Sequence, residues 1–202
     1  MGASGVGATA LGRATADALA FPHHDTDDYY WLPTTPPYRQ KRDIADRLRL
    51  MREVFLDRPD WVLSGSLEGW GNPVAPLFDL VVFVETPTEI RLKRLRDRET
   101  RHFGVNAVAP GGWRHWETEE FIEWASHYED GTRGGRSLLG HLAWLATLKC
   151  PILRVNGARP ITASVQDIVR ALRVGTDVHR IRCGAGPKPE EVRVQANQPR
   201  RV

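Results

Sequence analysis

The chain has 202 residues, enough for one sizeable core, and its 41% hydrophobic and 26% charged content is ordinary for a globular protein. No apolar run reaches the roughly 18 residues of a membrane helix, and the two cysteines, Cys150 and Cys183, lie too far apart in sequence for a disulfide framework or zinc site. The formal net charge of +3 arises after Gly175, where six Lys and Arg outnumber three acids. We therefore expect a cytoplasmic domain over residues 1–174 without membrane or nucleic-acid partners, then a basic, loosely ordered tail over 175–202.

The N-terminal stretch GASGVGAT, Gly2 to Thr9, matches most of the phosphate-loop pattern G-x-x-x-x-G-K-S/T. In that pattern backbone amides surround the phosphates, the lysine reaches the outer phosphates, and the hydroxyl holds Mg²⁺. Gly2 and Gly7 occupy both glycine positions and Thr9 the hydroxyl position, but Ala8 stands where the lysine should be. An Ala-rich helix is expected from about residue 8 to 20, so the loop would end at a helix N-terminus, which favours anions. The alternative is a flexible segment of small residues without a ligand.

A phosphate loop ordinarily follows a buried strand. Here only Met1 precedes the loop, so we expect a sheet whose first strand is missing. If the loop is functional, we expect seven of its residues to bind phosphate: Gly2, Ser4, Gly5, Val6, Gly7, Ala8 and Thr9.

The remaining chain alternates apolar runs with amphipathic segments. Strands are expected within residues 21–25, 61–66, 78–85 and 151–155, and helices over about 39–56, 89–103, 117–129, 136–148 and 164–172. This alternation predicts an α/β fold with a parallel sheet flanked by helices. Ligands bind at the carboxyl ends of strands in such sheets, so the loop, the acids of residues 25–28 and the hydroxyls of residues 64–66 should lie along one edge.

This ordered set of segments, from the loop through HHDTDDYYW, WVLSGS and DLVVFVETPTEIRLKRLRDR to CPILRVNG, resembles the P-loop kinase group. That group includes adenylate, shikimate and gluconate kinases, nicotinamide riboside kinase, and small bacterial adenylate-kinase-like or AAA-type ATPases, in which a loop without lysine is typical. The resemblance covers about Gly2 to Leu172 and implies a P-loop NTPase fold of the nucleoside/adenylate kinase type. It also implies ATP and Mg²⁺ as cofactors and transfer of the γ-phosphate to a small-molecule hydroxyl or phosphate. The alternative, favoured by Ala8, is a non-catalytic nucleotide-binding protein or degenerate ATPase.

Three acids lie at or just after the end of the strand expected within residues 21–25, where kinases of this group carry a catalytic acid: Asp25, Asp27 and Asp28. Asp25 and Asp27 alternate, so an extended strand would place them on one side. We expect Asp27 to act as the catalytic base, and Asp25 either to bind Mg²⁺ together with Thr9 or to orient the reacting groups. The alternative is that these acids only cap a turn.

Positive charge must come from elsewhere, because Ala8 supplies none and phosphoryl transfer depends on charge neutralisation. Four arginines recur at three- and four-residue spacing and so share one helix face: Arg91, Arg94, Arg98 and Arg101. The resemblance implies a lid over about residues 91–135, in which Arg94 and Arg98 contact ATP and act in catalysis. The alternative is a solvated charged face.

The strand expected within residues 61–66 runs into SGSLEGWG, whose hydroxyls and Glu68 should lie near the site. Glu68 would be a second acid, although a glycine turn explains the segment nearly as well. Nothing in the sequence selects the acceptor or the oligomeric state, because kinases for many small molecules share one scaffold.

Overall fold

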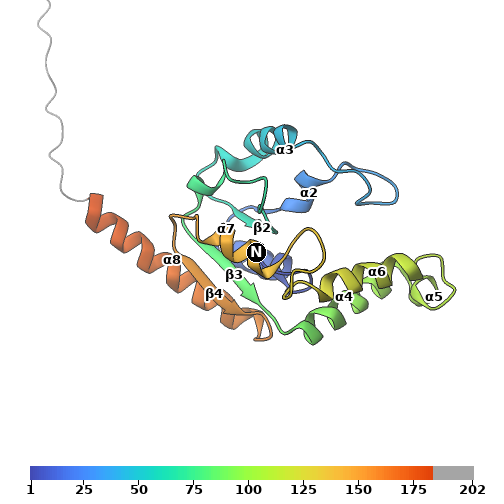
Figure 1. Cartoon of the computed structure of the whole chain (residues 1–202). Helices are drawn as coiled ribbons and strands as arrows, with labels where there is room; N and C mark the ends of the chain where they lie inside the picture. The colour runs from blue at the N-terminus through green and yellow to red at the C-terminus, as the bar shows by residue number, and fades with distance from the viewer. Residues whose placement is uncertain (184–202) are drawn as a thin grey trace, which may run out of the picture.

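The computed structural model describes residues 1–183, in which short parallel strands alternate with helices, as the α/β prediction requires (Figure 1). The strands are β1 (His23–Asp25), β2 (Val62–Ser64), β3 (Val81–Glu85) and β4 (Ile152–Asn156). The helices are α1 (Ala8–Leu19), α2 (Thr26–Tyr30), α3 (Ile44–Met51) with the π-helical turn η1 (Arg52–Leu56), the 3-10 turn η2 (Ala75–Leu77), α4 (Thr88–Phe103), α5 (Val105–Val108), α6 (His115–Ser126), α7 (Leu138–Leu145) and α8 (Ile161–Cys183).

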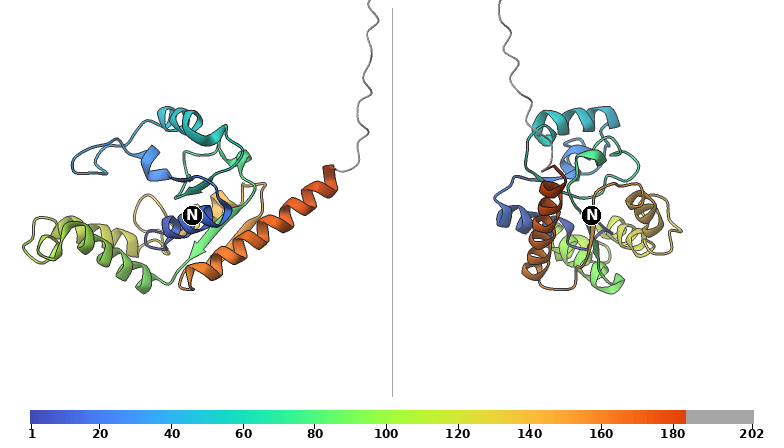
Figure 2. Two further views of the ribbon diagram at one scale, coloured as in Figure 1. Left: turned by 180° about the vertical axis from the view of Figure 1, so that it is seen from behind. Right: turned by 90° about the vertical axis from the view of Figure 1, so that its left-hand side faces the viewer.

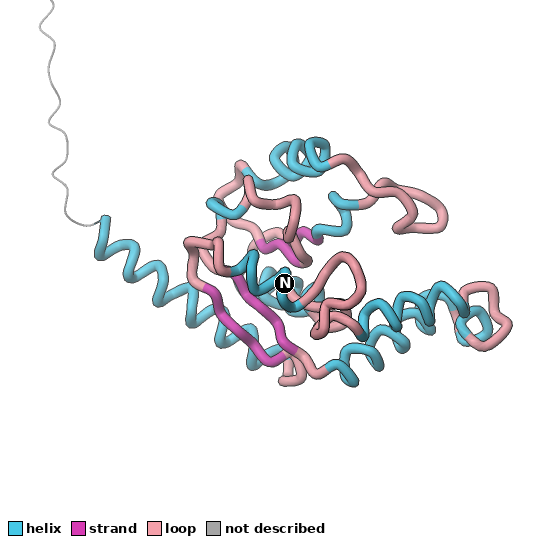
Figure 3. Tube along the Cα trace, viewed as in Figure 1, coloured by secondary structure: helices cyan, strands magenta, loops and turns pink. Residues whose placement is uncertain are grey.

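The strands form two parallel pairs rather than one continuous sheet. β1 pairs with β2, with Asp25 opposite Ser64, and β3 pairs with β4, with Val84 opposite Val155. The N-terminus lies between the two pairs (Figure 3). Its first two residues continue the β3 ladder on the edge away from β4. Gly2 pairs in parallel with Val84, whose amide donates to the Met1 carbonyl over 2.8 Å.

An apolar cavity of about 330 Å³ separates β2 from β3. Met1 lies at its rim, and its walls include Leu63 of β2, Val82 of β3 and Leu11 of α1. We call this space the inter-sheet cavity. It lies between the free edges of the two strand pairs, beside Met1.

Hydrophobic layers cover both faces of the strands. α1 and α8 pack together on one side, and α7 lies on the other (Figure 2). Val84, Val155 and Ile168 of α8 form the first layer, whereas Phe83 belongs to the second cluster, together with Phe55 of η1. Burial of such side chains contributes about 1.5–3 kcal/mol each. The carboxyl ends of the strands are thereby held in place.

Two arms extend from the strand ends toward the same side of the molecule (Figure 1). One holds α2 and the Pro-rich loop of residues 32–40, and the other holds α4, α5 and α6, within the region predicted as a lid. An ion pair joins them, because Arg39 Nη2 lies 2.6 Å from Glu117 Oε1. Both side chains are partly exposed.

Helix boundaries differ from the prediction in two places. The helix expected from about residue 39 begins only at Ile44. The final helix, α8, continues past Gly175 to Cys183, so the expected boundary at residue 174 falls inside it. The rest of the expected tail, residues 184–202, lies outside the described residues. Within residues 1–183, no helix has both the length and the apolar character needed to cross a membrane.

Candidate active site

The loop of residues 2–9 joins the β3 edge to the start of α1, as the phosphate-loop prediction requires. Gly5 and Gly7 adopt left-handed backbone angles, with φ of 82° and 93°. A Cβ at Gly5 would lie 2.6 Å from the carbonyl oxygen of Arg91. Glycine is therefore needed at Gly5 for its backbone angle and also for its close approach to α4.

Backbone amides of the loop are free to bind an anion. Val6 donates to the carbonyl of Ala3 over 3.3 Å. Within residues 1–183, five other loop amides donate to no group of the chain: those of Ser4, Gly5, Gly7, Ala8 and Thr9. Successive free amides at a helix N-terminus form a concave anion site, supported by the helix dipole.

The loop carbonyls, in contrast, are held by α4. Arg91 Nη1 donates to the Ser4 carbonyl over 3.3 Å. Arg94 Nη1 donates to the Val6 carbonyl over 3.2 Å, and its Nη2 donates to Gly157 over 3.0 Å. Arg94 thus lies beside the loop, with its guanidinium bound to two backbone carbonyls, and its expected contact with ATP stays a prediction.

The four spaced arginines do not form one solvated face. Arg91 is fully buried, whereas Arg101 is exposed and donates to the backbone of its own helix. Arg98 is also exposed and contacts Glu99. The 3.6-residue period of α4 brings Arg91 and Arg94 against the loop, because the first turns of the helix pack there. Further along the helix, the Arg98 guanidinium lies 5.4 Å from the centre of the Phe121 ring, and its charge acts on Asp27.

Thr9 and Asp25 come together at the carboxyl end of β1. The Thr9 hydroxyl donates to Asp25 Oδ2 over 2.7 Å. Among the described residues, no group of three or more His, Cys, Asp or Glu could hold a metal ion. Mg²⁺ needs no such group, because it binds one or two carboxylates together with substrate phosphates and water. The hydroxyl and carboxylate fit that donor set.

The predicted extended strand through Asp27 is wrong. β1 ends at Asp25, whose Oδ1 accepts from the Asp27 amide over 3.1 Å and caps α2. Aspartate favours this local bond, which turns the chain into a helix. Asp25 therefore both caps α2 and contacts Thr9. Asp27 lies in the first turn of α2.

Charges converge on Asp27. Its carboxyl is solvent-accessible but surrounded by protein, and this partial burial, together with Asp25, raises its pKa above the ordinary 3.8, although Arg136 and Arg98 act in the opposite direction. The pKa of Tyr38 is raised, first by burial and then by the charge of Asp27. The site thus contains an acid shifted toward the range of a general base, with two arginine charges acting on it.

A buried polar cluster behind the site could not be found from the sequence. His141 is fully buried, with its Nε2 3.0 Å from Ser66 Oγ and its Nδ1 2.7 Å from the Tyr128 hydroxyl. Burial lowers the pKa of His141 to about 3, so its 3.5 Å contact with Glu68 joins a carboxylate to a neutral ring. The cluster fixes the end of β2 against α7 and so positions Glu68. Arg136, just before α7, is a further site residue, because its charge acts on Asp27, and no motif in the sequence points to it.

Replacing Gly5 by alanine is expected to weaken Mg-ATP binding by at least about tenfold. Left-handed backbone costs an ordinary residue about 1–2 kcal/mol, and a tenfold change is about 1.4 kcal/mol. The Cβ would also push the loop away from Arg91. Titration calorimetry measures the change. Gly104→Ala is the control, because Gly104 has a similar φ of 88° with open space around it. Equal affinities in both variants would contradict this role of Gly5.

Comparison with solved structures supports the α/β fold. No family model matches the chain. A solved gluconokinase from Sinorhizobium meliloti 1021 superposes with a TM-score of 0.51, covering 89% of this chain and 93% of that chain, at 19% identity. At this identity the likeness concerns the fold alone, and it agrees with a kinase-like α/β fold.

Sequence comparison gives the family. The chain is 42% identical over 156 residues to the uncharacterized protein YqaC of Bacillus subtilis (strain 168), covering 77% of this chain and 85% of that protein. The chain belongs to the same family as YqaC.

Proposed function

We propose that this protein is an ATP-dependent phosphotransferase that transfers the γ-phosphate of ATP to a hydroxyl or phosphate of a small molecule. The observation that carries the proposal is the run of free amides at the start of α1, next to the Thr9–Asp25 pair. The kinase-like fold supports it.

Each residue has one task in the proposed reaction. The loop amides of residues 4–9 bind the phosphates, and Arg94 and Arg98 offset their charge. Thr9 and Asp25 hold Mg²⁺, which would neutralise charge on the β- and γ-phosphates. Asp27 accepts the proton of the acceptor hydroxyl as that oxygen bonds to the γ-phosphorus and the bond to the ADP oxygen breaks.

A second candidate is nucleotide binding without transfer. Ala8 favours it, because the lysine that reaches the outer phosphates is replaced by a methyl group. Both candidates require the loop to bind phosphate, and turnover alone separates them.

Titration calorimetry with Mg-ATP tests the binding step. We expect one site per chain and an affinity at least about tenfold lower in EDTA, because Thr9 and Asp25 would hold Mg²⁺, whose charge would favour phosphate binding. Thr9→Val should give the same low affinity with or without Mg²⁺. No binding of Mg-ATP would refute both candidates.

An acceptor screen with γ-labelled ATP tests the transfer step. Labelled product from a sugar, nucleoside or nucleotide acceptor would establish the phosphotransferase. Tight binding without transfer across the screen would favour the second candidate.

A further inference from the structure

The peptide geometry of the loop links its carbonyls to its amides. In a planar trans peptide, the carbonyl of one residue and the N–H of the next point in opposite directions. The Ser4 carbonyl accepts from Arg91, so the Gly5 amide points away from α4. The Val6 carbonyl accepts from Arg94 and Thr86, so the Gly7 amide also points away from α4. Both are among the free amides.

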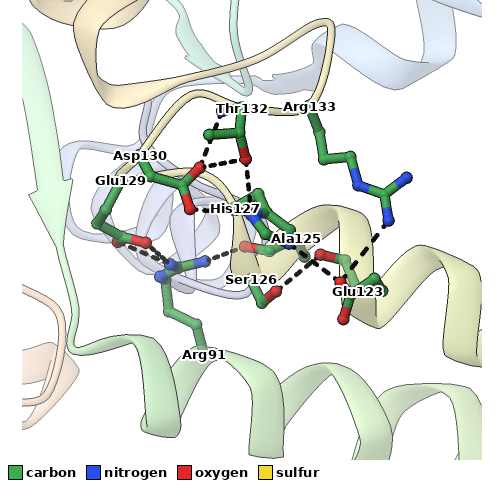
Figure 4. A network of polar contacts seen from close by, with 9 residues as sticks. All are labelled: Arg91, Glu123, Ala125, Ser126, His127, Glu129, Asp130, Thr132 and Arg133. Atoms are coloured by element: carbon green, nitrogen blue, oxygen red, sulfur yellow. Dashed lines mark hydrogen bonds and ion pairs between the residues drawn. The ribbon is translucent and has the colours of Figure 1, made fainter.

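Arg91 is buried and bonded to several groups of the protein, unlike an arginine on a solvated helix face. Its guanidinium is fully buried, donates to both Glu129 carboxylate oxygens over 2.7 Å, and donates to the Ala125 carbonyl over 3.2 Å (Figure 4). A further bond joins it to Thr88 Oγ1. Only a planar fork of several donors can bind all these groups together.

The segment that accepts hydrogen bonds from Arg91, residues 125–129, is held by further polar contacts. His127, between Ala125 and Glu129, lies 3.0 Å from Glu123 and 2.9 Å from Asp130 (Figure 4). The two acids raise the pKa of His127, mainly because their carboxylates accept hydrogen bonds from its ring nitrogens. These contacts of His127 stabilise the backbone at the end of α6, to which Arg91 is bonded.

We propose that Arg91 is a positioning residue that aims the Gly5 amide at a bound phosphate, with Arg94 doing the same for Gly7. The inference rests on the proposed phosphate-binding role of the loop. The charge of Arg91 is matched by Glu129, so orientation is its contribution. A loop with Ala8 in place of lysine depends on its amide dipoles, and two arginines of α4 set the direction of two of them.

The test uses inorganic pyrophosphate, with Mg²⁺, as the probe and the full chain as the protein. Arg91→Lys keeps the charge but cannot bind Ser4, Ala125 and Glu129 together, so we expect about tenfold weaker pyrophosphate binding. We also expect the NMR shift of the Gly5 amide on pyrophosphate addition to be lost. Arg96→Lys is the matched control, because Arg96 lies on the exposed side of α4 with Glu119.

The outcomes separate positioning from mere stability. A stabilising residue alone would lower the melting temperature and leave the Gly5 response of the folded molecules intact, which would overturn the proposal. Unchanged pyrophosphate affinity in Arg91→Lys would overturn it too. If Arg91→Lys does not fold, Arg94→Lys decides. Arg94 is only half-buried, and a lysine keeps the charge but cannot bind the Val6 and Gly157 carbonyls together, so this variant should lose the Gly7 response.

Failure of the proposed function has a different signature. Wild-type protein that binds pyrophosphate but transfers no phosphate from ATP would refute the phosphotransferase and leave the positioning role intact. Wild-type protein that gives no Gly5 or Gly7 response would overturn the positioning role.

Discussion

Replacing Asp27 by asparagine is expected to lower the rate of phosphoryl transfer by about 10²–10⁴-fold while Mg-ATP still binds. Asparagine keeps the shape of the side chain but cannot accept the acceptor's proton. The Thr9–Asp25 contact does not involve the Asp27 side chain, so the metal site should persist. Single-turnover transfer and calorimetry on the same samples measure the two effects. Asp28→Asn is the control, since Asp28 is a neighbouring exposed acid. Full activity in Asp27→Asn would remove Asp27 as the base.

The raised pKa of Asp27 gives this substitution two pH signatures. The transfer rate should rise as the pH rises through a value above 3.8, and Asp27→Asn should lack that rise. The native state also binds this proton more readily than the unfolded chain, so stability falls as the pH rises through the same window. Asp27→Asn should therefore be slightly more stable than the wild type at neutral pH. A variant that was less stable and kept the pH rise would contradict both expectations.

Extending the chain ahead of Met1 by four apolar, β-branched residues is expected to raise the melting temperature by roughly 10 °C. Such a strand would pair with the edges of β2 and β3 and fill the inter-sheet cavity of about 330 Å³. Its buried side chains contribute about 1.5–3 kcal/mol each, against about 1.5 kcal/mol per residue of ordering entropy. Differential scanning calorimetry measures the gain. A Gly-Ser extension of equal length is the control, and equal melting temperatures would mean that the cavity does not accept a strand.

The same extension should change how stability depends on pH. The Met1 ammonium donates to the Val82 carbonyl over 2.7 Å, yet burial lowers its pKa from 8.0 to about 5. The unfolded chain therefore binds more protons between pH 5 and 8, and stability rises with pH across that window. A peptide bond at Met1 removes this titration and should flatten the curve.

The sequence predicted those parts of the site that depend on local pattern. Loop glycines, a hydroxyl at Thr9 and an acid at a strand end suffice to bring Thr9 and Asp25 together, because parallel strands end on one edge. Asp27 was misplaced, because a single side-chain bond from Asp25 turned the strand into α2. Local competition of this kind leaves no trace in hydrophobic periodicity.

Tertiary packing explains the remaining differences. The spacing of the α4 arginines cannot tell a buried position from an exposed one, because the groups around Arg91 include Ser4, Ala125 and Glu129, which are distant in sequence. Likewise, Ser66, Tyr128 and His141 are far apart in sequence and meet only in the fold. The sequence motifs therefore predicted the loop and the acids at the strand end, and they did not predict the parts of the site that long-range contacts build.

The Arg39–Glu117 ion pair has a consequence for ligand exchange. It bridges the two arms that border the site, so we expect ligand entry and product release to require the arms to separate. An exposed pair contributes about 0.2–1 kcal/mol, which would bias the bridged form by no more than about fivefold and weakens with salt. We therefore expect this contact to open spontaneously, and turnover limited by product release to accelerate with ionic strength.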